Sequence, residues 1–197
     1  MGRRSREWRY ERLRRLSDGP FPALTIRYGR RFLADYPDHG LAWLLVGIDL
    51  VSLARYEEAE QAFAKAIDLC PEEKRQVPFA QMGHLFREAG DYDLAVDWYR
   101  RAVEAAPGDA TYLIFQGCML AKWGRFAEAE EVHRAATECA EGCIDEAFLN
   151  LGLVLRARGR FAEAADCFRA AIRLDPEYRA ARRALRDVEL CLKLGGS

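Results

Sequence analysis

The 197-residue chain has few lysines and almost no net charge. Only four lysines accompany 26 arginines, and the formal net charge is −1 at pH 7. A nearly neutral chain has no global attraction to nucleic acid or to an anionic membrane. No segment reaches the roughly 18–20 consecutive apolar residues that a membrane-spanning helix requires. The arginine-rich N-terminus also lacks the apolar stretch of a secretory signal, so we expect a soluble cytoplasmic protein.

The chain also lacks the motifs of common catalytic and metal sites. It contains three histidines, no Gly-rich phosphate loop, no Gly-x-Ser-x-Gly and no His-Glu-x-x-His. The pair that could act as catalytic nucleophile and base is Cys118 with His84, and no motif supports that pair. Cys139 and Cys143 lie four residues apart, but zinc sites usually need a second such pair. We therefore predict no enzyme, no metal and no cofactor. The six cysteines are expected to be reduced and buried as small hydrophobes, and His39 to lie in a solvated loop.

A repeat of about 34 residues organises most of the sequence. Each copy has a central glycine, and the four glycines follow at steps of 36, 34 and 35 residues: Gly47, Gly83, Gly117 and Gly152. A residue four before and a residue three after each glycine share one helical face. These flanking residues are Trp43 and Leu50, Phe79 and Phe86, Leu113 and Leu120, and Phe148 and Leu155. Such regular steps indicate a stack of similar units, each of which buries a face against the next.

A second helix is expected in each copy. It shows the same spacing with small residues around one ring, as in Ala59–Phe63–Ala66 and Ala164–Phe168–Ala171. Small residues beside a ring let it enter a groove of the neighbouring helix. A glycine inside a helix costs roughly 1 kcal/mol relative to alanine, so its recurrence indicates close approach of that helix. Turns are predicted between the two helices at Ala54-Arg55, Gly90-Asp91, Gly124-Arg125 and Gly159-Arg160.

This pattern resembles the tetratricopeptide repeat. The resemblance covers residues 40–178, divided at about 40–73, 76–109, 110–144 and 145–178. The third copy departs from the pattern at Gln116, His133 and Glu141, where an apolar residue, an aromatic residue and a proline are expected. The resemblance implies an all-α fold, a right-handed superhelical array of antiparallel helix pairs. It also implies that the first helices line a concave surface and the second helices form the convex back.

Two segments flank the four copies. Residues 179–197 are predicted to form a capping helix and a tail, because Tyr178, Ala181, Leu185, Val188 and Leu192 make one apolar stripe. Residues 1–39 are predicted to form a basic helical cap or a degenerate leading repeat. Its second helix would bury the following face: Phe21, Leu24, Tyr28 and Phe32.

The N-terminal flank concentrates positive charge. Residues 1–31 hold ten arginines and three acidic residues, a balance of +7. Such asymmetry suggests nucleic acid, an anionic surface or an acidic partner. Neither a base-stacking module nor a zinc finger accompanies the arginines. Nucleic acid is therefore the less favoured alternative, and packing of the segment against the first repeat is favoured.

The resemblance also implies where a partner would bind. Family ligand positions on the first helices fall in this chain on Leu41, Leu44, Ile48, Ala80, His84, Arg87, Ile114, Cys118, Lys122, Leu149, Asn150, Leu153 and Arg156. The chaperone-binding members of the family grip a terminal carboxylate with lysine and asparagine donors. Leu44, Ile48 and Ala80 hold the corresponding positions here, so that role is excluded.

The mixture of apolar and polar groove residues predicts a non-enzymatic interaction module. Burying an aliphatic side chain contributes roughly 1.5–3 kcal/mol, and such a groove suits a helical or extended segment of a protein partner. The alternatives are coverage of the apolar end by the chain's own N-terminal helix, or a homodimer through the same groove.

Overall fold

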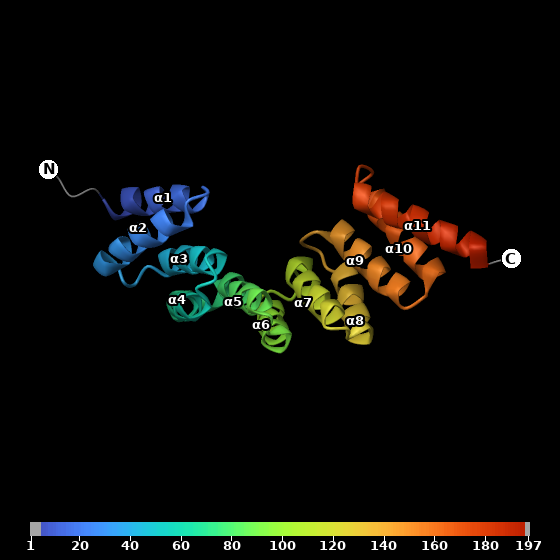
Figure 1. Cartoon of the computed structure of the whole chain (residues 1–197), viewed down its shortest axis with the longest axis horizontal. Coiled ribbons are helices and arrows are strands. Elements are labelled where there is room, and N and C mark those ends of the chain that lie inside the picture. The colour runs from blue at the N-terminus through green and yellow to red at the C-terminus, as the bar shows by residue number, and fades with distance from the viewer. Residues whose placement is uncertain (1–4, 196–197) are drawn as a thin grey trace. The chain divides into compact units, whose positions relative to one another are not determined.

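The computed structural model describes residues 5–195 and shows an all-α protein (Figure 1). No strand occurs among these residues, apart from an isolated bridge between Asp109 and Glu141. The α-helices are α1 (Arg6–Ser17), α2 (Pro22–Asp35), α3 (Gly40–Ser52), α4 (Tyr56–Leu69), α5 (Gln76–Ala89), α6 (Tyr92–Ala105), α7 (Ala110–Lys122), α8 (Phe126–Thr137), α9 (Ile144–Ala157), α10 (Phe161–Leu174) and α11 (Arg179–Gly195). A short 3₁₀ turn, η1 (Glu72–Lys74), lies between α4 and α5. The predicted all-α fold class is confirmed.

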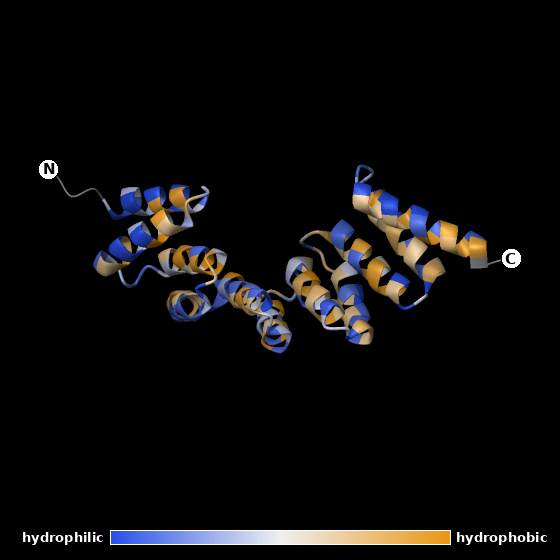
Figure 2. Ribbon diagram, viewed as in Figure 1, coloured by the Kyte–Doolittle hydropathy of each residue, from blue (hydrophilic) through white to orange (hydrophobic). Residues whose placement is uncertain are grey.

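The helices belong to two compact units, residues 1–105 and 106–197. In the first unit α3 pairs with α4 and α5 with α6, and in the second α7 pairs with α8 and α9 with α10. Within each unit, the helix that follows a pair contacts both helices of that pair, as α3 contacts α1 and α2, and α9 contacts α7 and α8. Hydrophobic and hydrophilic residues are interleaved along each helix (Figure 2), as expected when one face is buried.

The repeated glycines lie where a ring of the paired helix touches the backbone. A Cβ on Gly83 would stand 2.6 Å from the Tyr99 ring, and one on Gly152 would stand 2.5 Å from the Phe168 ring. Gly47 meets the ring of Phe63 in the same way. Real Cβ atoms do not approach other atoms so closely, so no larger residue fits without displacing the ring. The predicted close approach of the two helices is confirmed.

The turns within the pairs use a left-handed residue. Gly90, Gly124 and Gly159 have φ between 76° and 85°, and Ala54 has φ 55° at the matching position of the first repeat. The residue that follows donates its N–H to a carbonyl five residues earlier, for example Arg55 to Leu50 at 2.9 Å and Arg160 to Leu155 at 2.9 Å. This bond satisfies a carbonyl that the end of the helix leaves open.

The helix α2 buries a different face from the one predicted. Its buried residues are Thr25, Ile26, Gly29, Phe32 and Leu33. Of the four predicted face residues only Phe32 is fully buried, whereas Phe21 and Leu24 are exposed. The prediction was wrong because it followed the large apolar residues of α2. The contact with α1 and α3 uses the small residues Thr25 and Gly29.

The C-terminal helix α11 follows the predicted stripe only in part. Ala181, Ala184 and Val188 are buried against α9 and α10, but Leu192 is exposed. The stripe therefore ends near Val188, because the helix extends past the elements it packs on. None of the helices within residues 5–195 has the length and apolar character needed to cross a lipid bilayer. The last two residues of the predicted tail lie outside the described range.

The expectation that the cysteines are buried was wrong. Cys118 and Cys143 are exposed, and the other four are only partly buried. Cys143 precedes the first turn of α9, and Cys139 lies in the loop before it. Within residues 5–195 no group of three or more His, Cys, Asp or Glu side chains lies close enough together to hold a metal ion.

Candidate functional site

The predicted groove residues of the first unit differ widely in exposure. Leu44 and Ala80 are buried and Ile48 packs against the core, so these three offer a partner little surface. Leu41 on the first turn of α3 is 55% exposed. In this unit, the surface around Leu41, and not the whole set of predicted groove residues, is the apolar surface that a ligand can reach.

The polar groove residues of α5 are engaged within the protein. His84 Nδ1 lies 2.7 Å from the Tyr99 hydroxyl of α6. Burial, together with the nearby Arg87, lowers the pKa of His84 to about 4, so its ring is neutral near pH 7. Arg87 pairs with Glu88 at 2.9 Å. A neutral histidine held by a tyrosine orders the contact between α5 and α6 and supplies no charge to a ligand.

In the second unit the predicted groove is largely occupied by packing. Ile114 and Leu149 are buried, and Leu153 packs with the core that α11 completes. Arg156 forms an ion pair with Asp187 of α11 at 2.8 Å. Asn150 buries its amide nitrogen, for which no hydrogen-bond partner occurs among the described residues. Of the predicted set in this unit, Cys118 and Lys122 are exposed.

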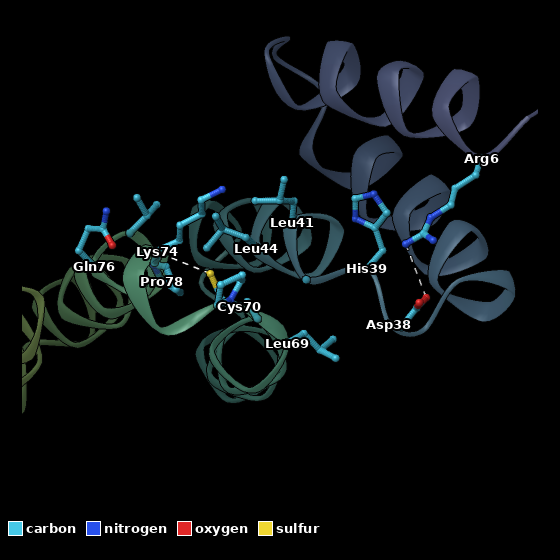
Figure 3. A pocket seen from close by; sticks show the side chains of 14 residues that line it. Arg6, Asp38, His39, Leu41, Leu44, Leu69, Cys70, Lys74, Gln76 and Pro78 are labelled. Carbon is cyan, nitrogen blue, oxygen red and sulfur yellow. Dashed lines mark hydrogen bonds and ion pairs between the residues drawn. The ribbon is translucent and has the colours of Figure 1, made fainter. Parts of the chain in front are cut away.

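A pocket of about 550 Å³ lies beside Leu41 in the first unit. Figure 3 shows Leu41 and Leu44 between two groups, with Gln76, Lys74 and Pro78 on one side and Arg6, Asp38 and His39 on the other. The full lining comprises Arg6, Asp38, His39, Gly40, Leu41, Leu44, Ala66, Leu69, Cys70, Pro71, Lys74, Gln76, Val77 and Pro78. The pocket therefore joins the first turns of α3 and α5, the end of α4 and the first residue of α1.

One wall of the pocket depends on His39, which was expected to be solvated. Its Nδ1 accepts a hydrogen bond from the Ala42 N–H at 3.2 Å, which caps the N-terminus of α3. The ring also packs on Tyr10 of α1, with centroids 4.4 Å apart. Burial, and then the charge of Arg6, lower the pKa of His39. The prediction failed because α1 returns over the loop and covers the imidazole.

The opposite wall is formed by the segment between α4 and α5, where two repeat glycines are farthest apart in sequence. The 36-residue step between Gly47 and Gly83 accommodates η1, whose last residue, Lys74, lines the pocket. The Lys74 carbonyl accepts a hydrogen bond from the Cys70 thiol, with the sulfur 3.3 Å away, and this bond holds the turn against the end of α4. Gln76 buries its side-chain oxygen without a hydrogen-bond partner among the described residues. The extra residues thus place a cation and an amide beside the apolar interior.

The chemistry of the pocket suits an apolar side chain with a polar neighbour. Leu41, Leu44, Val77 and Pro78 supply apolar walls, and Val77 is 41% exposed. At the rim, Arg6 lies 3.7 Å from Asp38, whereas no carboxylate pairs with Lys74 among residues 5–195. The helix α1 borders the pocket through Arg6 but does not fill it, because Leu41 stays exposed.

Sequence reasoning found Leu41 and Leu44 and missed most of the remaining wall. Lys74 and Gln76 lie at the junction of the first and second repeats, where family ligand positions are not expected, whereas Val77 holds in the second repeat the position that Leu41 holds in the first. The unequal 36-residue step was the available signal, because two extra residues must form structure of their own between α4 and α5.

The positive charge of the N-terminal flank is largely neutralised within the fold. Residues 5–31 contain eight arginines, and five pair with carboxylates: Arg6, Arg9, Arg14, Arg15 and Arg30. The side chain of Arg9 pairs with Asp35 at 2.7 Å and lies over the ring of Tyr36, 5.3 Å from its centroid. These contacts fix α1 on α2 and reduce the charge that a nucleic acid would meet.

Comparison with known proteins identifies the repeats. Models described as tetratricopeptide repeat match residues 26–74 and 81–142, and a further one matches residues 145–178. No curated protein matches the chain by sequence.

Several solved structures share the fold. YrrB, described as a TPR protein with an unusual peptide-binding site, is 23% identical, with 88% of each chain covered and a TM-score of 0.66. MamA from Desulfovibrio magneticus RS-1 is 19% identical over 88% of this chain and 97% of that one, with a TM-score of 0.70. The first TPR of Spaghetti (RPAP3), bound to an HSP90 peptide, is 21% identical over 61% of this chain and 95% of that one, with a TM-score of 0.57. Because the repeat models match more than half of the sequence and the helix pairs stack in series within each unit, the chain belongs to the tetratricopeptide repeat family.

Proposed function

We propose that this protein is a non-enzymatic adaptor that binds a helical or extended segment of a partner protein. The tetratricopeptide fold generally supports protein–protein interaction, which makes this the function class to expect. In our proposal residues 40–178 form the binding array, and residues 1–39 and 179–197 flank it. The cytoplasmic location expected from the sequence stays a prediction.

The pocket beside Leu41 carries the proposal. Its size of about 550 Å³ accommodates one or two apolar side chains, and three exposed apolar residues, Leu41, Leu69 and Val77, line it. Exposed apolar surface of this kind commonly marks an interaction site. A partner that inserts an apolar residue gains burial free energy, and Lys74 at the rim favours an acidic or carbonyl group beside that residue.

The mode of binding differs from a carboxylate clamp. The HSP90 peptide belongs to the RPAP3 structure, and this chain has Leu44 and Ala80, both buried, at positions where a clamp would need donors. We therefore propose recognition of an internal apolar residue of the partner segment.

The test uses peptides selected from a random displayed library on the full-length protein. Leu41→Glu places a charge at the pocket mouth, and because Leu41 is 55% exposed the variant should keep its helical circular dichroism. We expect the selected peptides to bind this variant at least tenfold more weakly. The matched control is Leu174→Glu, because Leu174 is 56% exposed on α10 of the other unit.

Equal binding to wild-type protein and a folded Leu41→Glu variant would exclude the pocket. Failure to select any peptide, together with a dimer that Leu41→Glu dissociates in sedimentation, would assign the surface to a second copy of the chain.

A further inference from the structure

The pair α1–α2 carries a second apolar surface, which shares no residue with the pocket beside Leu41. We name it the outer α1–α2 face and define it by Trp8, Arg12, Phe21, Leu24 and Tyr28. Trp8 on α1, Phe21 immediately before α2 and Leu24 on α2 are 43%, 57% and 50% exposed, which is high for three large apolar side chains on one pair of helices. Isolated apolar residues on a surface need no explanation, but a group of them on one pair of helices does.

Arg12 joins the two helices across this face. Its guanidinium carbon lies 5.8 Å from the centroid of the Trp8 ring and 5.4 Å from that of Tyr28. On α1, Trp8 and Arg12 are four residues apart, and on α2 so are Leu24 and Tyr28, so each pair shares a helical face. The four side chains therefore line one seam between α1 and α2.

The seam has positive charge that the fold does not neutralise. Arg12, Arg27 and Arg31 have no carboxylate partner among residues 5–195, in contrast to the five paired arginines of the same segment. Arg27 and Arg31 are exposed on α2, one residue before and three residues after Tyr28. The aromatic seam is thus bordered by three guanidinium groups without a carboxylate partner in the described part of the chain, and on α1 also by Glu7 and by Glu11, which pairs with Arg14 and Arg15.

The geometry is that of a surface that receives a helix. In this unit α3 packs on both α1 and α2, and α5 packs on both α3 and α4. Apart from each other and α3, no helix of the unit makes a substantial contact with α1 or α2. The outer seam of the first pair therefore lacks the covering helix that the inner seam has in α3.

We propose that the outer α1–α2 face binds an amphipathic helix of another protein, one in which aspartate or glutamate residues flank an apolar stripe. Its apolar stripe would cover Trp8, Leu24 and Tyr28, and its carboxylates would pair with Arg12, Arg27 and Arg31. Guanidinium–carboxylate pairs and aromatic anchors at the centre of an interface commonly contribute much of the binding energy.

The same charges disfavour the other occupants. A second copy that used this face would bring arginines against arginines. The exposed Leu190 and Leu194 of α11 would not suit it either, because Arg183 and Arg186 share their helix. Single-stranded nucleic acid needs free aromatic faces for its bases, whereas the Arg12 guanidinium already lies near both the Trp8 and the Tyr28 rings.

The experiment measures binding of three labelled probes to the full-length protein by fluorescence anisotropy. The first is an 18-residue helical peptide with leucines at i, i+3, i+4 and i+7 spacing and glutamates beside them. The second has lysine in place of every glutamate, and the third is a 20-nucleotide oligouridylate. We expect the glutamate peptide to bind at least tenfold more tightly than the lysine peptide, with an affinity that falls as salt rises.

Variants locate the site. Trp8→Ala and Arg12→Ala should each weaken the glutamate peptide about tenfold. Arg14→Ala is the matched control, because Arg14 pairs with Glu11 and stands two residues after Arg12, a spacing that puts it on another face of the same helix. Leu41→Glu should leave this binding unchanged, which distinguishes binding to the outer α1–α2 face from binding to the pocket beside Leu41.

Three results would overturn the proposal. They are equal affinity for the two peptides, binding that survives both seam variants, and tighter binding of the oligouridylate that those variants abolish. Self-association of the free protein that Trp8→Ala disrupts would also overturn it, in favour of a dimer.

Discussion

Leu13 of α1 lies against Gly29 of α2, with its Cδ1 atom 3.4 Å from the position that a Cβ on Gly29 would occupy. Thirty-four residues later the same two positions hold Gly47 and Phe63. The first pair therefore keeps the close contact of the later pairs but exchanges the large and the small residue. A consensus-based reading of the sequence overlooks this pair, because it looks for the glycine on the first helix.

Gly29→Ala should destabilise the protein. The added Cβ would overlap Cγ2 of Val46 on α3, and crowding of this kind in a packed core costs about 1–3 kcal/mol. Urea unfolding measures the change. In a Val46→Ala background the same substitution should cost less, because the colliding methyl group is gone. An equal cost in both backgrounds would show that the overlap with Val46 is not the cause of the destabilisation.

Ala54→Gly should stabilise the protein. Ala54 is the one non-glycine residue with positive φ among residues 5–195, at a turn where three later repeats have glycine. A Cβ in the left-handed region costs roughly 1–2 kcal/mol, part of which is offset by the greater freedom of glycine in the unfolded chain. We expect a gain of about 0.5–1 kcal/mol by urea unfolding. The matched control, Gly159→Ala, should lose a similar amount, and a loss for both variants would contradict the strain argument.

The repeat made the helices and their central contacts predictable. A glycine opposite a ring is a local pattern, so Gly83 against Tyr99 followed from spacing alone. The pocket was harder to predict because its walls come from α1, α3, α4, η1 and α5. The cover that α1 places over His39 is a tertiary contact that no periodicity encodes. Exposure also depends on neighbours, and for that reason Leu44 proved buried while Leu41, three residues earlier, proved open.

Asp49→Asn should stabilise the protein at neutral pH. Asp49 on α3 is buried, and its Oδ2 has no hydrogen-bond partner among the described residues. Burial raises the pKa of Asp49 to about 6, and hydrogen bonding to Ser17 and Thr25 partly offsets that rise. Because this pKa lies above the ordinary value of 3.8, the native state holds the proton of Asp49 more tightly than the unfolded chain does. The free energy of unfolding that this proton contributes is present at low pH and is lost as the pH rises through 6.

The expected gain for Asp49→Asn is about 1–2 kcal/mol at pH 7.5, and it should shrink toward zero at pH 4, where the native carboxyl is protonated. Urea unfolding at the two pH values measures it. Asp35→Asn is a control of opposite sign, because Asp35 pairs with Arg9, whose side chain is mostly buried, and loss of this ion pair should destabilise the protein. A gain of equal size at both pH values would show that ionisation of Asp49 is not the cause.

His133→Phe tests the departure of the third repeat from the pattern. The buried His133 ring stands where Phe63 and Phe168 stand in their repeats, and a Cβ on Gly117 would lie 2.6 Å from its Cε1. Its Nδ1 is buried without a hydrogen-bond partner among residues 5–195, a cost that a phenyl ring avoids.

Burial lowers the pKa of His133 to about 4, so the unfolded chain takes up a proton near pH 6.5 while the native protein does not. The stability linked to this group is therefore complete above pH 6.5 and is lost as the pH falls toward 4. We expect His133→Phe to gain about 1–2 kcal/mol at pH 7.5, and about 2 kcal/mol more than that at pH 5, in urea unfolding followed by circular dichroism. His84→Gln, at the other histidine with a pKa of about 4, should flatten the pH dependence without the gain at pH 7.5, because it removes the partner of the Tyr99 hydroxyl. A difference between wild-type protein and His133→Phe that does not change with pH would show that the ring is protonated equally in both states.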